Sequence, residues 1–542
     1  MSVIEVPVLI VGGGPVGLGL ALDLGGRGIE CLVIEKLADI EAGIKINPRA
    51  AAITPRTMEF CRRWGVAKAV HNAGFPEDYA LNLVYCTSLD GHTIAVNKFP
   101  SMKDRIPHPV SPETRERCPQ IWFDPILAAG LAQFPGCRFE MHWQLEAFED
   151  KGTHVTAQIR NLDTGDLQIV ECTYLAACDG SASIVRTALG VETEGTGSLG
   201  YAVNVVLDIP DFMSLHKKGT AERYYFIDHR GVWSLLTVID GRERWRFGIM
   251  GTLDPSELAN VDVEAAMARA LGPHVKYEIV AHAPWHRRES IARRFRIGRV
   301  FLAGDAAHAM GPDLGLGMNT GAADSFDLGW KIEATMRGWG GAGLLDSYEA
   351  ERRPAAIRNA EASTKTYRRL VMPGDSAQHV LEENPRGEEA RKAVGAQLLS
   401  VLKEGWDTIG LAMGYRYENS PICVPDGSPP PVEKGFADYV QSSRPGGRAP
   451  HAWLAAGRST IDLFGNGFVL MRAEDVDVAG IRDAAGERGV PLSVVDITDP
   501  AIKALYQDAL VLVRPDGHVA WRSNHSPSEP LQLIDKVRGA EL

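Results

Sequence analysis

One stretch near the middle of the chain combines an acidic side chain with a glycine-rich turn. It reads Arg299-Val-Phe-Leu-Ala-Gly-Asp305, and it is followed closely by Pro312-Asp-Leu-Gly-Leu-Gly317-Met-Asn319. The apolar residues that run into Gly304-Asp305 predict a buried strand whose end presents a carboxylate. Periodic apolar residues over 320–332 predict a helix after the glycines. A strand end, an acid and a helix N-terminus can together hold a polyhydroxylated, partly anionic cofactor.

The beginning of the chain contains a second arrangement of this kind. Val8–Val11 predicts a short buried strand, and Gly12-Gly-Gly14-Pro-Val-Gly17 follows it, with apolar residues at helical spacing beyond. A further strand, Cys31–Ile34, ends at Glu35, about 20 residues past the glycines. The glycines permit a tight turn and the close approach of a pyrophosphate, and the acid can accept both adenosine-ribose hydroxyls. Strand, turn, helix, strand and acid together predict an ADP-binding βαβ unit.

A second match to the glycine pattern, Gly195-Thr-Gly197-Ser-Leu-Gly200, lacks this context. It follows polar residues, and it precedes Tyr201–Ile209, which has the pattern of a strand and not of a helix. We therefore expect one dinucleotide-binding domain. A nicotinamide cofactor would then have no nucleotide domain of its own.

Composition excludes several other classes of protein. A chain of 542 residues predicts about two to four domains. Its 57 Lys and Arg residues against 69 Asp and Glu give a net charge of −12, which argues against nucleic acid or an anionic membrane as the main partner. The eight cysteines contain no Cys-x-x-Cys pair, so no disulfide framework or zinc ribbon is predicted. His282 and His286 have the spacing of two metal ligands on one helix, but Pro284 between them breaks a helix, so no metal site is predicted there either.

The apolar run Val6–Leu22 is not expected to be a membrane span or a signal peptide. It holds five glycines and two prolines and has no basic leader. We expect a cytoplasmic protein.

The remaining elements suggest how the chain is organised. Residues 201–250 predict an antiparallel sheet rich in aromatic side chains, which fit either core packing or the wall of an aromatic substrate site. The pattern is helical from about 338 to 413, and Pro354 is expected to end the first helix there. The prolines within 420–431 mark a linker.

Beyond the linker lies a small unit with its own order of elements. Strands are expected at 462–464 and 468–471, then helix, strand and helix, and finally a pair of strands near the C-terminus. This order suits a thioredoxin-like fold. Since the unit holds no pair of redox cysteines, we predict that it serves packing or oligomerisation and not electron transfer.

Three separated stretches resemble motifs of the class A flavoprotein aromatic hydroxylases, the family of p-hydroxybenzoate and phenol hydroxylases. Gly12–Gly17 with Glu35 matches the ADP site of the family, Asp179-Gly180 matches its Asp-Gly motif, and Arg299–Asp305 matches its Gly-Asp motif. The nearest branch is that of 2,4-dichlorophenol monooxygenase-like enzymes and polyketide hydroxylases. The resemblance implies an α/β fold: a Rossmann-like FAD-binding domain of the glutathione-reductase type, an antiparallel-sheet substrate domain and a thioredoxin-like C-terminal domain.

The resemblance also implies which residues contact FAD. Arg49 would contact phosphates, Gln120 the flavin, and Asp305 a ribityl hydroxyl, while Asp124, which replaces a glutamate of the family, is interpreted as a helix cap. Backbone N–H groups at the helix start after Gly317 would stabilise negative charge on reduced flavin. The residues assigned to the cofactor are Gly12, Gly14, Pro15, Val16, Gly17, Glu35, Lys36, Arg49, Gln120, Leu145, Asp179, Asp305, Pro312, Gly317, Met318 and Asn319.

The implied activity is that of an FAD-dependent monooxygenase. NAD(P)H would reduce FAD, and the reduced flavin would bind O2 as a C4a-hydroperoxide that hydroxylates a phenolic or polycyclic aromatic substrate. Ala51 stands where phenol hydroxylases carry an aspartate. Baeyer–Villiger-type insertion into a polyketide ketone is therefore an alternative, and a non-catalytic ligand carrier is another. Tyr201, Tyr225, His229 and His308 are conceivable phenol-activating bases, and none is assigned.

The resemblance and the linker together predict domain boundaries. They are residues 1–75, 105–186 and 290–370 for the FAD-binding domain, 76–104 and 187–289 for the substrate-binding sheet domain, 371–430 for a helical connection and linker, and 431–542 for the thioredoxin-like domain. The expected partner is a small aromatic substrate. The sequence is also compatible with a homodimer.

Overall fold

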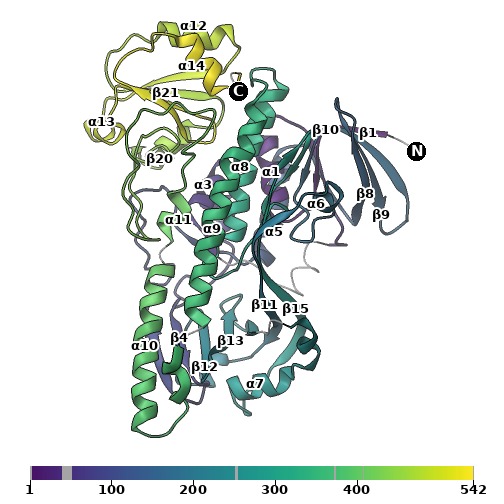
Figure 1. The fold of residues 1–542 in the computed structure, drawn as a ribbon, viewed down its shortest axis with the longest axis vertical. Coiled ribbons are helices and arrows are strands. Elements are labelled where there is room, and N and C mark those ends of the chain that lie inside the picture. Colours follow the sequence, from purple (N-terminus) through teal and green to yellow (C-terminus); the bar gives the residue numbers. More distant parts are fainter. Residues whose placement is uncertain (1–2, 40–51, 251–253, 372–373, 407, 541–542) are drawn as a thin grey trace.

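The computed structural model describes residues 3–39, 52–250, 254–371, 374–406 and 408–540. Figure 1 shows an elongated molecule, in which the C-terminal unit (yellow) lies at one end and a large sheet at the other. Two long helices, α8 (Gly317–Met336) and α9 (Ser347–Val371), run along the middle of the molecule. None of the helices in the described ranges combines the length and apolar character needed to cross a membrane.

The first sheet is mainly parallel. Its main path runs in the order β16-β17-β10-β1-β2-β7, and β9 and β8 continue it as antiparallel strands beside β10. β1 is parallel to β10 and β2, which places the apolar residues 8–11 between two buried strands. The bounds are β1 (Val3–Val11), β2 (Cys31–Glu35), β7 (Cys137–Met141), β8 (Trp143–Asp150), β9 (Val155–Asn161), β10 (Leu167–Ala177), β16 (Arg296–Ile297) and β17 (Val300–Leu302).

Helices cover this parallel sheet. Helix α1 begins at Pro15, immediately after the glycine turn, and it packs against α8. Proline suits a first helical position because its missing N–H would lack a partner there anyway. Helix α1 itself spans Pro15–Gly26, and the other α-helices described before α8 are α3 (Pro55–Arg63), α4 (Ala67–His71), α5 (Gln120–Gly130), α6 (Ile184–Ala188) and α7 (Val263–Leu271), of which α7 packs against the second sheet instead.

The second sheet is antiparallel except where β12 pairs with β4. Its order is β18-β15-β11-β14-β13-β12-β4-β5. The bounds are β4 (Leu83–Cys86), β5 (Thr93–Asn97), β11 (Thr193–Asp208), β12 (Arg223–Asp228), β13 (Gly231–Val238), β14 (Arg244–Ile249), β15 (Glu278–Ala292) and β18 (His308–Ala309), while a separate short ribbon pairs β3 (Ala52–Ile53) with β6 (Glu116–Arg117). The glycines 195–200 lie inside β11, so the prediction that they precede a strand and no helix is confirmed.

The aromatic residues of this sheet mostly serve packing. Tyr224, Phe226, Trp245 and Phe247 lie in one hydrophobic cluster on one face of the sheet. The opposite face meets α9 and α10 (Pro385–Trp406), and there Tyr225 stacks on the ring of a neighbouring tyrosine at 5.0 Å between centroids. Core packing, one of the two readings that the sequence allowed, therefore accounts for these five rings.

Two predicted boundaries are wrong. Helix α9 continues through Pro354, because buried charged contacts of Glu351 and Arg352 hold the turn around the proline. A strand was expected at 462–464, but residues 462 and 463 belong to a short 3₁₀ helix, Thr460–Leu463, and Phe464 caps it. A reciprocal cap favours this helix, since Asp462 accepts the Ser459 N–H while Ser459 Oγ accepts the Ile461 N–H.

The C-terminal unit is a four-stranded sheet with helices. Its order is β22-β21-β23-β24, with β21 and β22 parallel and the other pairs antiparallel. Trp330 and Trp339 pack edge-on against Phe468, which joins the unit to α8. Helix α11 (Ile409–Met413) precedes the unit, whose elements are β19 (Trp453–Ala455), β20 (Arg458–Ser459), β21 (Phe468–Arg472), α12 (Ala479–Glu487), β22 (Leu492–Asp496), α13 (Pro500–Tyr506), β23 (Leu510–Val513), β24 (Val519–Ser523) and α14 (Pro530–Val537).

Buried charges also join this unit to α8 and α9. Arg514 donates to Glu351 Oε2 at 2.8 Å and to Asp516 Oδ2 at 2.6 Å, and Lys331 Nζ lies 2.7 Å from Asp327 and 2.6 Å from Glu351. Burial raises the pKa of Asp327 to about 8, although Lys331 opposes this effect. Burial would also raise the pKa of Glu351, but Arg514 and Lys331 outweigh it and lower the pKa to about 2.

Candidate functional site

The glycine turn after β1 leaves open space above the first turn of α1. A Cβ on Gly17 would lie 2.0 Å from the carbonyl oxygen of Gly12, so only glycine fits there. A Cβ on Gly14, in contrast, would have no atom within 4 Å. The first N–H groups of a helix have no partner inside the helix, and they can therefore face a ligand in this space. The turn thus fits a pyrophosphate.

Glu35 stands beside this turn at the end of β2. Its Oε2 accepts the Gly13 N–H at 2.8 Å, and its Oε1 accepts the Leu37 N–H at 3.0 Å. The two bonds fix the carboxylate next to the glycines, and each oxygen retains acceptor capacity for a ribose hydroxyl. Lys36 follows with an exposed side chain, whereas Leu145 is buried in β8 as part of the hydrophobic core.

Asp179 follows β10 and lies against the same turn. A Cβ on Gly12 would approach the Asp179 nitrogen to 3.0 Å, which shows how closely the two segments meet. Asp179 Oδ2 accepts the N–H groups of Ile184 and Val185 at 2.9 and 3.3 Å. Its Oδ1 is buried and has no hydrogen-bond partner among the described residues. A buried acceptor of this kind fits a site that is completed by a ligand.

The Gly304-Asp305 turn meets the first glycine turn directly. Gly304 has φ +57°, and a Cβ there would lie 2.8 Å from a methyl group of Val16. Val16 also faces Gly321 of α8, where a Cβ would lie 2.5 Å from the same methyl group. The turns after β1, β10 and β17 therefore lie together at the carboxyl ends of neighbouring parallel strands, where open α/β sheets bind ligands.

Asp324 of α8 supports the Gly304 turn through hydrogen bonds and ion pairs. It accepts the Gly304 N–H at 3.0 Å, lies 2.6 Å from His308 Nε2, and accepts Arg352 Nε at 2.8 Å. All of these side chains are buried. Burial would raise the pKa of Asp324, but His308 and Arg352 outweigh it and lower the pKa. His308, one of the conceivable bases, is thus committed to this contact.

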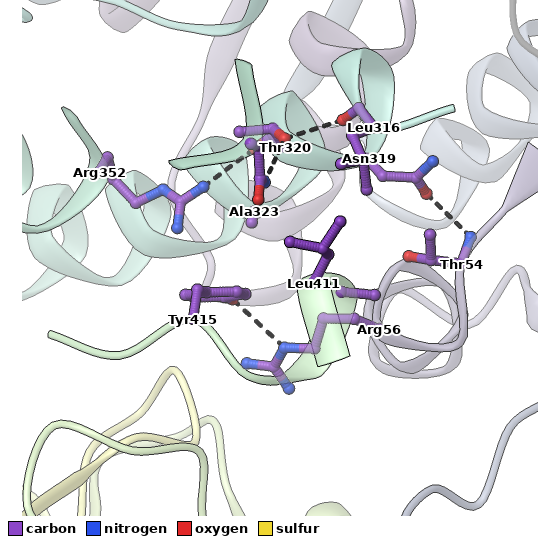
Figure 2. Close-up of a pocket in the computed structure, with 11 residues that line it drawn as sticks. Thr54, Arg56, Leu316, Asn319, Thr320, Ala323, Arg352, Leu411 and Tyr415 are labelled. Carbon is purple, nitrogen blue, oxygen red and sulfur yellow. Dashed lines mark hydrogen bonds between the residues drawn. The ribbon is translucent and has the colours of Figure 1, made fainter. Parts of the chain in front are cut away.

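Asn319 fixes the loop that leads into α8. Its amide nitrogen donates to the carbonyl oxygens of Gly315 at 2.6 Å and Ala52 at 3.0 Å, and its Oδ1 accepts the Thr54 N–H at 2.9 Å. Figure 2 shows this last bond at the edge of a cavity of about 20 Å³. Such a volume holds about one water molecule. The cavity is too small for a cofactor or an aromatic substrate.

Gln120 begins α5, and its side chain donates to Asp124 Oδ2 at 2.9 Å. The interpretation of Asp124 as a helix cap is wrong, because it lies one turn inside the helix and is buried. Burial raises the pKa of Asp124 to about 8, although the bond from Gln120 lowers it. A protonated Asp124 could donate as well as accept.

The other predicted residues differ in exposure and in contacts. Pro312 is exposed, and Met318 is half-buried at the start of α8. Tyr201 stacks on His286 with ring centroids 4.3 Å apart, and His229 lies on an exposed turn. The predictions for Arg49 and for the aspartate replaced at position 51 lie outside the described residues.

Sequence reasoning missed two groups of charged side chains. One is Asp324 of α8 with Arg352 of α9. The sequence could have indicated this pair, because each residue is ionisable and stands among the apolar positions of its helix. The other is a set of arginines on the second sheet, including Arg223 and Arg246, which interrupt strands of otherwise apolar and aromatic residues.

Comparison with known proteins matches both parts of the chain. Residues 5–363 match the FAD binding domain family, and residues 442–538 match the aromatic-ring hydroxylase C-terminal family. Aklavinone 12-hydroxylase RdmE of Streptomyces purpurascens is 32% identical over 564 residues, which cover 98% of each chain.

Two solved structures share the fold over almost the whole length. RebC soaked with chromopyrrolic acid, with bound 7-carboxy-K252c, has a TM-score of 0.91 and 38% identity, covering 99% of this chain and 100% of RebC. The ternary complex of aklavinone-11 hydroxylase with FAD and aklavinone has a TM-score of 0.81 and 30% identity, covering 99% of each chain.

Proposed function

Since this chain belongs to the FAD-dependent aromatic-ring hydroxylases, we propose that it hydroxylates a phenolic or polycyclic aromatic compound. It is a monooxygenase that binds FAD and consumes O2 and a reduced pyridine nucleotide. The observation that carries the proposal is the meeting of three turns at one sheet edge, with Val16 packed against Gly304. A ring-oxygenating flavin needs its ADP end and its ring end held by one rigid site.

We propose that different residues around these turns contact different parts of FAD. Gly12 to Gly17, with Glu35, Lys36 and Leu145, would hold the ADP half, and Arg49 would contact phosphates. Asp305 would hold the ribityl chain, with Gln120 and Asp179 beside it. Pro312 and Gly317–Asn319 would line the flavin ring. When bound, FAD supplies the redox chemistry that transfers one oxygen atom from O2 to the substrate, while the protein orients both and excludes water.

We also propose the domain division that the sequence predicts. In the C-terminal unit, 431–542, the order β21-α12-β22-α13-β23-β24 with one parallel strand pair supports a thioredoxin-like fold. The mainly antiparallel second sheet supports a substrate domain formed by 76–104 and 187–289. The FAD-binding domain then comprises 1–75, 105–186 and 290–370, and 371–430 connects it to the C-terminal unit. We place the protein in the cytoplasm.

The test uses purified protein loaded with FAD. NADH or NADPH is supplied with a panel of phenols, naphthols and polycyclic phenols, and we measure pyridine nucleotide oxidation, peroxide release and products. We expect at least one compound to stimulate oxidation and to gain a ring hydroxyl. Protein stripped of flavin is the control. Absence of stimulation across the panel contradicts the proposal, and an ester or lactone carbonyl seen by NMR would indicate Baeyer–Villiger insertion instead.

A further inference from the structure

Helix α3 is bonded at its N-terminus to the segment 312–319, which is proposed to line the flavin ring. Asn319 Oδ1 accepts the Thr54 N–H at 2.9 Å, and the Asn319 amide nitrogen donates to the Gly315 carbonyl oxygen at 2.6 Å. Thr54 is the N-cap of α3, and its side chain accepts the Thr57 N–H. Because an N-cap fixes where a helix begins, the segment and the first turn of α3 are held in one relative position.

The same helix is bonded to the C-terminal unit. Arg56, in its first turn, donates to the carbonyl oxygen of Asp516 at 3.2 Å. Arg62, in its last turn, donates to both carboxylate oxygens of Asp462, at 2.7 and 2.9 Å. The helix is thus attached to the unit near both of its ends.

Glu59 joins the helix to the unit through a buried carboxylate. Its Oε2 accepts Arg448 Nε of the unit at 3.0 Å and an N–H of Arg56 at 2.8 Å, and its Oε1 accepts Ser111 Oγ at 2.7 Å. Burial would raise the pKa of Glu59, but Arg448 and Arg56 outweigh it and lower the pKa. One negative charge therefore lies between a cation of its own helix and a cation of the C-terminal unit.

Arg448 is fixed to the sheet of the C-terminal unit. Its backbone pairs with that of His518, next to the first residue of β24. The N–H of Ala449 donates to the Gly517 carbonyl oxygen at 2.9 Å. A displacement of this sheet would therefore move the guanidinium group and, through Glu59, helix α3.

A buried triad of charges is a weak source of stability. Removing the charges from water costs much of the energy that their attraction returns, and apolar residues can often replace such groups without loss. Hydrogen bonds are directional, so the triad can instead fix one position of α3 relative to the unit. At a rise of 1.5 Å per residue, Glu59 lies only about 8 Å along the helix from Thr54. The fixed position is therefore carried to the N-cap over less than two turns.

A second connection runs from Arg56 to the chain that precedes the unit. Arg56 Nε donates to Tyr415 Oη at 3.4 Å, and Figure 2 shows this bond beside the small cavity. The guanidinium group of Arg352 lies 5.1 Å from the centre of the same tyrosine ring, and it donates to the carbonyl oxygen of Thr320 at 3.1 Å. Thr320 directly follows the segment 312–319. Two buried arginines thus link this segment to the C-terminal part of the chain.

We propose that the C-terminal unit holds the segment 312–319 in place through α3, and that Glu59 and Arg448 are positioning residues for the flavin ring. They act through Thr54 and Asn319. This role rests on the proposed function, because it requires that the segment lines the ring. The N–H groups at the start of α8 stabilise negative charge on the reduced flavin only while they face it, so a displaced segment makes the flavin harder to reduce.

The test measures the bound flavin in the full-length protein loaded with FAD. We expect Arg448→Met to lower the reduction potential, to change the visible circular dichroism of the flavin, and to raise the dissociation constant of FAD about threefold or more, since members of one network are coupled by energies of this order. Glu59→Gln, which keeps the shape of the side chain, should act in the same direction. Arg448→Lys should restore most of the wild-type values because it keeps the charge. Arg488→Met, which removes a pair with Asp535 within the unit, is the matched control and should change none of them.

A double variant separates positioning from a general loosening of the fold. Asn319→Ala breaks the link between the segment and α3, so adding Arg448→Met should shift the potential no further. Additive shifts, an unchanged flavin in Arg448→Met, or an equal shift in Arg488→Met would overturn the proposal. If far-ultraviolet circular dichroism shows that Arg448→Met is unfolded, Glu59→Gln decides by the same criteria. These readouts need neither substrate nor NAD(P)H, so a failure to hydroxylate any aromatic compound counts against the proposed function alone.

Discussion

Replacing Arg514 by methionine is expected to destabilise the contact between the C-terminal unit and helices α8 and α9. The Arg514 side chain is fully buried and contacts Glu351, Asp516 and Asp327. In the variant Lys331 would be left to neutralise the buried carboxylates of α8 and α9. Removing one partner of a buried ion pair costs about 3–5 kcal/mol, because the other charge stays desolvated. We expect a loss of this size.

The loss can be measured by urea unfolding of the FAD-loaded protein. Tryptophan fluorescence follows the unfolding, and two of the eleven tryptophans, Trp330 and Trp339, pack against Phe468 at this contact. The double variant Arg514→Met/Glu351→Gln should recover part of the stability, because it also removes a charge left without its partner. Two neighbouring substitutions that share a partner are not expected to be additive.

The matched control is Arg488→Met. Arg488 pairs with Asp535 on the surface of the same unit, and its side chain is 29% exposed. Such pairs contribute about 0–1 kcal/mol. The reasoning is refuted if Arg514→Met costs no more than this control, or if the double variant is as unstable as the sum of its two single changes.

Three further results are expected. Burial raises the pKa of Asp327 from 3.8 to about 8, so between these two values the folded state keeps a proton that the unfolded state has released. The free energy of unfolding therefore falls as pH rises through this range. Asp327→Asn should flatten that part of the dependence of melting temperature on pH. Gly14→Ala should fold but bind FAD more weakly, while Gly17→Ala should fail to fold stably, as flavin fluorescence and circular dichroism can show. Hydrogen bonds to Glu113 and to a second glutamate raise the pKa of His71 from 6.5 to about 10. His71→Asn should therefore lower the melting temperature most below pH 6.5 and have no effect above about pH 10, as thermal melts between these pH values can show.

The parts of the site that could be predicted from the sequence are those with a local pattern. The turn Gly12–Gly17 follows an apolar strand and leads directly into α1, and Gly304-Asp305 follows another apolar strand and precedes α8 after the short strand β18. Their neighbours in sequence therefore reveal them. The βα units around them have the predicted strands and helices. What remained hidden depends on contacts between distant segments.

The missed residues illustrate this limit. Asp324 accepts a hydrogen bond from Gly304, twenty positions earlier in the chain, and nothing in the sequence between them indicates it. Arg223 and Arg246 both pair with Thr237 of β13, which is seen only when the register of three strands is known. Pro354 was expected to end a helix, because its local preference is visible in the sequence and the buried contacts that override it are not.

The strand order of the first sheet has a consequence for the synthesis of the protein. β1 lies between β2 and β10, and β10 lies next to β17. Residues 8–11 therefore need partners at 174–177, and residues 175–177 in turn need partners at 300–302. At about 5–20 residues per second, a ribosome needs roughly 15–60 s to make the first 300 residues. During this time the strand before the N-terminal glycine turn lacks partner strands that the complete sheet provides. The flavin can be captured only late, when most of the chain has left the ribosome, and a nascent chain that stalls earlier exposes apolar strands to aggregation.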